Sequence, residues 1–179
     1  PALGVGPGNT PAYITKDAKI KRAVNDLFLS KTFDNGMICA SEQAIIVDNE
    51  VYNDVKAEFL AHNAYIVSSK AELAKLQAAV MLPDGHAVNP KIVGFSAKYI
   101  AELAGIKVPE ETKLLIAEIA GVGVDFPLSR EKLSPVLAMV KANSTEEGLD
   151  LCEAMLDLGG LGHTAVIHTE DEDLQIQFG

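Results

Sequence analysis

The stretch KLLIAEI, residues 113–119, decides the fold class. It is an almost unbroken apolar run, which is typical of a strand that is buried on both faces by helices, as in a parallel sheet. Short runs of the same character lie at residues 44–47 (AIIV), 136–140 and 165–168. The four runs therefore predict strands of a mainly parallel sheet.

Segments with helical periodicity alternate with these strands. In residues 17–33, apolar side chains at Ile20, Ala23, Val24, Leu27 and Phe28 recur at the spacing of one helix face. Further helices are expected at residues 50–62, 69–81, 96–105 and 144–158. Ser69 and Ser144 stand where each of two helices needs an N-terminal cap. This alternation predicts an α/β fold with three αβα layers, formed by residues 1–179 as one domain. The glycine run GVGPG, residues 4–8, lacks the last glycine and the lysine of phosphate-binding loops and is interpreted as a turn.

Composition and charge exclude some classes of binding partner. The chain has 179 residues, 48% of them hydrophobic, and a formal net charge of −10. Such a negative field repels nucleic acid and anionic membranes, so neither partner is expected. No signal-peptide pattern or long apolar run is present, which predicts a cytoplasmic protein. Two cysteines do not make a disulfide framework, and no histidines and cysteines have the spacing of metal ligands, so no metal is expected.

The two cysteines have different surroundings. Cys152 shares the apolar stripe of the helix at residues 144–158, so it is expected in the core. Cys39 lies in FDNGMICASEQ, residues 33–43, between a helix and a strand, directly after a turn signal. A thiol in such a loop is accessible, and backbone N–H groups can stabilise an oxyanion beside it. The residues alone leave two interpretations of Cys39 open, a nucleophile and an inert small side chain.

Three further residues are candidates for a site. His163 follows GGLG directly before a strand and is either a general base or a loop histidine bonded to backbone. Glu118 closes the strand at residues 113–119, and Glu131 opens REKLSPV before the next strand. Ligands of open α/β sheets collect at the carboxyl ends of strands, although a carboxylate there is more often only solvated.

Taken in order, these segments resemble the catalytic domain of the aldehyde dehydrogenase superfamily. The segments that carry the resemblance are ALGVGPGNTP, SKTFDNGMICASEQ, REKLSPV and GGLGHT, and the likeness covers essentially the whole chain. It is strongest to the CoA-acylating acetaldehyde dehydrogenase half of bifunctional aldehyde-alcohol dehydrogenases. The resemblance implies that Cys39 attacks the aldehyde carbon, that the thiohemiacetal passes hydride to NAD, and that the resulting thioester is transferred to coenzyme A.

The resemblance also implies roles for individual residues. Glu131 is expected to hold the hydroxyls of the nicotinamide ribose, although Leu133 and Ser134 depart from the family's phenylalanine and glycine there. His163 is expected to deprotonate CoA, and Glu118 to be a partner near the active site. Ala2 stands where hydrolytic relatives carry the glutamate that activates water. Without that base, a thiol acceptor is expected to outcompete water.

Finally, the resemblance implies that this domain belongs to a larger enzyme. The NAD-binding domain is expected before Pro1, and an alcohol dehydrogenase half after Gly179, in a homo-oligomeric fermentation enzyme that acts on acetaldehyde or acetyl-CoA. Two alternatives remain: a hydrolytic or semialdehyde dehydrogenase of the same superfamily, and a non-catalytic assembly module. The accessibility of Cys39 separates the last alternative from catalysis, because an assembly module has no need of an exposed thiol.

Overall fold

The computed structural model describes residues 8–179 and contains one six-stranded sheet. Its strand order is β3-β4-β5-β2-β1-β6, and every pairing between neighbours is parallel. The strands are β1 (Thr10–Ile14), β2 (Glu42–Asp48), β3 (Ala64–Val67), β4 (Leu114–Glu118), β5 (Val136–Ala142) and β6 (Val166–His168). The parallel α/β sheet expected from the apolar runs is therefore confirmed.

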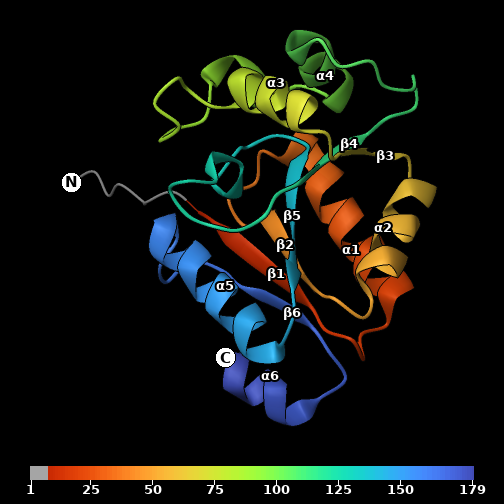
Figure 1. The fold of residues 1–179 in the computed structure, drawn as a ribbon, viewed down its shortest axis with the longest axis vertical. Helices are drawn as coiled ribbons and strands as arrows, with labels where there is room; N and C mark the ends of the chain where they lie inside the picture. The colour runs from red at the N-terminus through yellow and green to blue at the C-terminus, as the bar shows by residue number, and fades with distance from the viewer. Residues whose placement is uncertain (1–7) are drawn as a thin grey trace.

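Helices cover both faces of this sheet (Figure 1). The helices are α1 (Ile20–Thr32), α2 (Tyr52–Ala61), α3 (Lys70–Val80), α4 (Ala97–Ala104), α5 (Thr145–Gly159) and α6 (Glu172–Phe178). Helices α1 and α2 pack on one face, against side chains such as Leu114 and Ile116. Helices α3 and α4 pack on the other face against Leu115, and α5 extends that layer over β1 and β2. Successive residues of β4 thus point to opposite cores, which confirms the three αβα layers.

The caps act as the sequence indicates. The side-chain oxygen of Ser69 accepts from the N–H of Glu72 at the start of α3, and Ser144 accepts from Glu147 at the start of α5. The carboxylate of Glu147 turns back to the N–H of Asn143 at 2.7 Å, one residue before the position that a reciprocal capping box uses.

Two strands, β1 and β3, were not predicted from the sequence. Strand β1 reads TPAYI and has no β-branched run, yet it pairs on both sides, with β2 and β6. Pro11 is tolerated in this interior strand because the register shifts between Thr10 and Pro11, so its missing N–H falls at an irregularity of the ladder. Strand β3 has only four residues and lies at the sheet edge.

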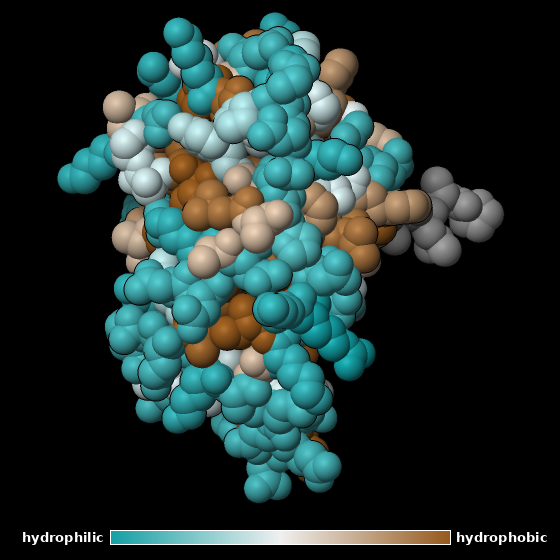
Figure 2. Space-filling model, turned by 90° about the vertical axis from the view of Figure 1, so that its right-hand side faces the viewer, coloured by the Kyte–Doolittle hydropathy of each residue, from teal (hydrophilic) through white to brown (hydrophobic). Residues whose placement is uncertain are grey.

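The outer surface is mostly polar on the side that carries α1 and α2, with smaller apolar patches between (Figure 2). Among residues 8–179, no helix combines the length and apolar character needed to cross a bilayer. Ala2 lies outside the described residues, as does the expected glycine turn except for Gly8.

Candidate active site

Three of the four predicted site residues lie where strands begin. Cys39 precedes β2, Glu131 precedes β5, and His163 precedes β6. Because the sheet is parallel and its order runs β5-β2-β1-β6, these loops lie side by side at one edge. This is the amino edge, opposite to the carboxyl edge at which ligands of open α/β sheets usually bind.

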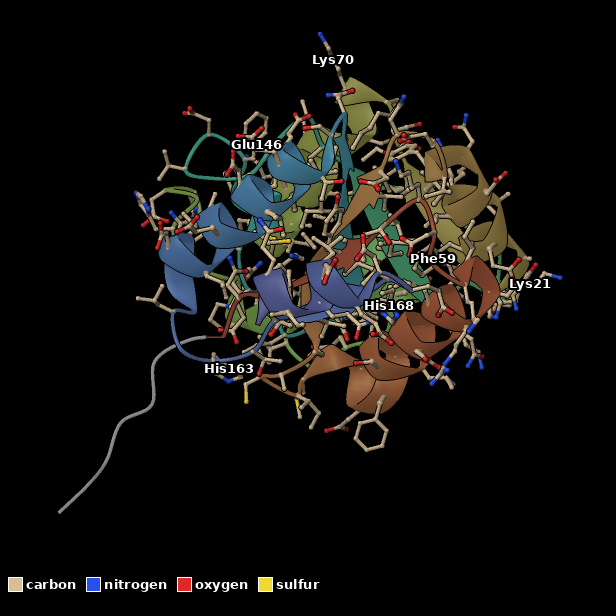
Figure 3. The ribbon with its side chains drawn as sticks, turned by 90° about the horizontal axis from the view of Figure 1, so that it is seen from below. Lys21, Phe59, Lys70, Glu146, His163 and His168 are labelled. Carbon is tan, nitrogen blue, oxygen red and sulfur yellow. The ribbon has the colours of Figure 1, made fainter. Side chains whose placement is uncertain are left out.

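Gly8 is the point on which the three loops converge. A Cβ placed on Gly8 would lie 2.4 Å from the carbonyl oxygen of Cys39 and 3.4 Å from Cε1 of His163. The N–H of Gly8 donates to Oε1 of Glu131 at 3.1 Å. Figure 3 shows His163 next to the point where the described chain begins. The chain therefore needs a glycine here, because any side chain would push the cysteine loop away.

An unusual backbone presents the cysteine. Asp34, Asn35 and Gly36 have φ values of 47°, 49° and 70°, a run of left-handed residues for which Asn, Asp and Gly are the suitable types. The Asn35 side-chain amide donates to the carbonyl of Gly94 at 2.9 Å, which anchors the turn. The chain leaves the turn with the Cys39 side chain exposed.

Cys152 contrasts with Cys39. It is 3% exposed on the inner face of α5, and burial raises the pKa of its thiol to about 12. The expectation of a core cysteine at residue 152 is confirmed. A thiol with such a pKa is almost entirely protonated at neutral pH and is a poor nucleophile, so Cys39 is the thiol available for chemistry.

Glu131 lies half-buried and lines a pocket of about 210 Å³. Burial raises the pKa of this carboxyl, while the Gly8 N–H and the charges of Lys31, His163 and Lys132 lower it. Asn9 lines the same pocket, and its buried Oδ1 has no partner among the described residues. The pocket thus offers an amide oxygen and a carboxylate, two acceptors suited to hydroxyl groups.

Leu133 and Ser134, which depart from the family pattern after Glu131, contact the loops around the site through their backbone carbonyls. Leu133 has a φ of 43°, and its carbonyl accepts from the N–H of Gly94 at 3.1 Å. Ser134 is fully buried, and its carbonyl oxygen would lie 2.5 Å from a Cβ on Gly36. This segment therefore packs directly against the turn that presents the cysteine.

Glu118 is not part of this cluster. It lies at the carboxyl end of β4, where its carboxylate accepts from the hydroxyl of Tyr52 at 3.1 Å and from the ammonium of Lys56 at 2.7 Å. The structure does not bring Glu118 together with Cys39, Glu131 and His163, because residues at the two ends of parallel strands lie on opposite edges of the sheet. Its partners come from α2, which begins at that carboxyl edge.

Three buried polar residues behind the site were not predicted from the sequence. They are Lys31 on α1, Gln43 on β2 and Lys132 next to Glu131, each with an exposed fraction of 0%. Their positions in the sequence indicated burial only weakly. Each residue stands beside a candidate segment, but lysine and glutamine are usually solvated in such positions.

Comparison with known proteins agrees with the geometry. Residues 4–82 match the aldehyde dehydrogenase family. An aldehyde-alcohol dehydrogenase from Streptococcus pneumoniae is 49% identical over the whole of this chain, which spans 21% of that protein. The chain thus has about a fifth of the length of this curated relative.

Two solved structures show the same fold. An acetylating aldehyde dehydrogenase from Geobacillus thermoglucosidasius has a TM-score of 0.93 and 46% identity, covering 99% of this chain and 39% of its own. A propionaldehyde dehydrogenase from Rhodopseudomonas palustris, solved with bound CoA and an acylated cysteine, has a TM-score of 0.86 and 26% identity, covering 99% of this chain and 39% of its own. In sequence and in fold, the chain is therefore similar to members of the aldehyde dehydrogenase family.

Proposed function

We propose that this chain is the catalytic domain of a CoA-acylating aldehyde dehydrogenase. The overall reaction converts an aldehyde, CoA and NAD into an acyl-CoA, NADH and a proton. The observation that carries the proposal is the convergence of the loops of Cys39, Glu131 and His163 on Gly8. The acylated cysteine and bound CoA of the Rhodopseudomonas palustris relative support it.

Cys39 is proposed as the nucleophile. Its thiolate sulfur forms a bond to the aldehyde carbon while the carbonyl π pair moves to oxygen, giving the anion of a thiohemiacetal. NAD, when bound, accepts the hydride that leaves this carbon. The carbonyl then re-forms, so the acyl group remains attached to Cys39 as a thioester. The exposed position of the thiol suits this role, because aldehyde and CoA must reach the same sulfur in turn.

His163 is proposed as the base for the second half-reaction. Its Nδ1 lies 2.9 Å from the Thr164 hydroxyl. If Nδ1–H donates to this hydroxyl, Nε2 can accept the proton of the CoA thiol. The CoA thiolate then attacks the acyl carbon and displaces the thiolate of Cys39, which completes the cycle.

Glu131 is proposed to hold the cofactor by the hydroxyls of its nicotinamide ribose. The chemistry of the pocket fits this group. Among the described residues, Oε1 of Glu131 accepts a hydrogen bond only from Gly8. Oδ1 of Asn9, in the same pocket, has no donor among them. Ribose hydroxyls supply such donors.

The wider setting of the enzyme is proposed by analogy with its relatives. The likeness to an aldehyde-alcohol dehydrogenase five times longer supports a complete protein with an NAD-binding domain and an alcohol dehydrogenase half. We accordingly propose acetaldehyde as the aldehyde, fermentation as the setting, the cytoplasm as the location, and a homo-oligomer as the assembly.

The test is CoA-dependent formation of NADH by the complete protein with acetaldehyde as substrate. The proposal requires acetyl-CoA as the product and loss of activity in Cys39→Ala. Release of free acetate without CoA would instead identify a hydrolytic dehydrogenase. Full activity in Cys39→Ala would remove Cys39 from the chemistry.

A further inference from the structure

Two lysines are fully buried behind the site, and they are bonded very differently. Nζ of Lys132 donates to the carbonyl oxygens of Gln43, Leu128 and Arg130 at 2.9, 2.8 and 2.7 Å. An ammonium has three donors, so all of them are used. Lys132 therefore acts as a structural clamp between β2 and the loop before β5.

Lys31 lacks such a set of partners. Its Nζ lies 3.4 Å from Oγ of Ser41 and 3.2 Å from Oε1 of Gln43, both long for hydrogen bonds to a charged group. Within residues 8–179, no ion pair within 4.0 Å joins either buried lysine to a carboxylate. A buried ammonium with two weak partners costs stability, so packing alone does not explain a lysine at this position.

Gln43 connects Lys31 to both sides of the site. Its Oε1 accepts from Nζ of Lys31 and also from the backbone N–H of Lys132 at 3.0 Å. Its Nε2 donates to the carbonyl of Ser41 at 2.9 Å. Ser41 is two residues after Cys39, and Lys132 directly follows Glu131. One buried side chain thus joins the cysteine loop to the loop that carries Glu131.

Burial and the neighbouring charges act on Lys31 in opposite directions. Burial lowers the pKa of Lys31 to about 7, whereas the negative charges of Glu42 at the start of β2 and Glu131 before β5 favour its protonated form. Lys132 is the remaining charged neighbour, and its own pKa is lowered by burial and by Lys31. In return, the charge of Lys31 lowers the pKa of Glu131.

We propose that Lys31 is a positioning residue for the cofactor. Its ammonium, through Gln43 and through the field that it exerts, keeps Glu131 ionised and aligned to accept the ribose hydroxyls. This role rests on the proposed function of Glu131. Lys31 itself touches neither substrate nor cofactor.

The test compares Lys31→Met with Lys21→Met in the complete protein. Both changes remove one lysine charge from α1, but Lys21 is exposed and outside the network. We expect Lys31→Met to raise the Kd for NAD roughly tenfold, the usual order for loss of a charge-assisted contact. Alkylation of Cys39 without NAD should change by less than about twofold, since the cysteine turn keeps its own anchors. Lys21→Met should match the wild type in both measurements.

The pH dependence separates positioning from simple packing. Wild type and Lys21→Met should lose affinity for NAD as the pH rises through about 7, because Lys31 then loses its proton. In Lys31→Met this component should be absent. A Lys31→Met protein with the wild-type Kd and the wild-type pH profile would overturn the inference.

A second variant guards against misfolding. Ser41→Ala removes one of the two acceptors of Lys31, together with the hydrogen bond from the Ser41 hydroxyl to the carbonyl of Gly36. It should shift the Kd for NAD in the same direction by a smaller factor. If Lys31→Met does not fold, an unchanged Kd in Ser41→Ala overturns the inference. A wild type that binds NAD but makes no acyl-CoA would refute the proposed function alone, because the Kd comparison still decides the role of Lys31. A wild type that binds no NAD would refute both.

Discussion

Replacing Gly8 with alanine should damage catalysis far more than folding. A Cβ at this position would lie 2.4 Å from the carbonyl oxygen of Cys39, whereas ordinary contacts begin at 3.4 Å. The carbonyl must therefore retreat by about 1 Å, and a displacement of that size at a reacting group costs on the order of 10²-fold in rate. This corresponds to about 2.7 kcal/mol of transition-state stabilisation. The overpacking itself should cost about 1–3 kcal/mol of folding stability.

The assay is kcat/KM for CoA-dependent NADH formation by the complete protein, with thermal unfolding measured in parallel. Gly105→Ala is the matched control, because Gly105 at the end of α4 has a φ of 66° but no atom within 4 Å of its added Cβ. It should lower stability by about 1 kcal/mol through backbone strain, without moving the cysteine. A Gly8→Ala enzyme with kcat/KM within about threefold of the wild type would refute the reasoning, since a 1 Å displacement then has no catalytic effect.

Three further predictions concern the thiols, the proposed base and the buried lysine. Iodoacetamide should modify native Cys39 much faster than Cys152, because one thiol is exposed and the other is buried with a raised pKa; equal rates by mass spectrometry would contradict the nucleophile assignment. In His163→Ala, stopped-flow measurements should retain the burst of NADH while turnover with CoA falls roughly 10²- to 10⁴-fold, whereas loss of the burst with normal transfer to CoA would place His163 on the aldehyde side. Folding lowers the pKa of Lys31 from 10.5 to about 7. Between these two pH values the unfolded state binds more protons than the folded state, so the free energy of unfolding rises with pH. Urea titrations at pH 7 to 8.5 should show wild-type stability rising relative to Lys31→Met by up to about 1.4 kcal/mol per pH unit, and a constant difference would exclude this titration.

The sequence by itself determined the layers of the fold and the exposure of the candidate thiol. Apolar runs such as residues 113–119 report burial on both faces, and the helical stripe in α1 reports burial on one face, so both signals are local. The turn DNG before Cys39 likewise has the residue types that left-handed backbone needs. Strand β1 gave no such signal, because its pairing on both sides comes from strands that are distant in the sequence.

Only the tertiary structure decided which candidate residues meet. Glu118 and Glu131 both flank strands and look equivalent in the sequence, but one follows its strand and the other precedes it. In a parallel sheet these positions fall on opposite edges, so Glu131 joins Gly8 and the cysteine loop while Glu118 pairs with Lys56. The buried hydrogen bond between Lys31 and Gln43 could not be predicted from the sequence either. A lysine is recognisable as buried only when the chain segments that enclose it are placed around it.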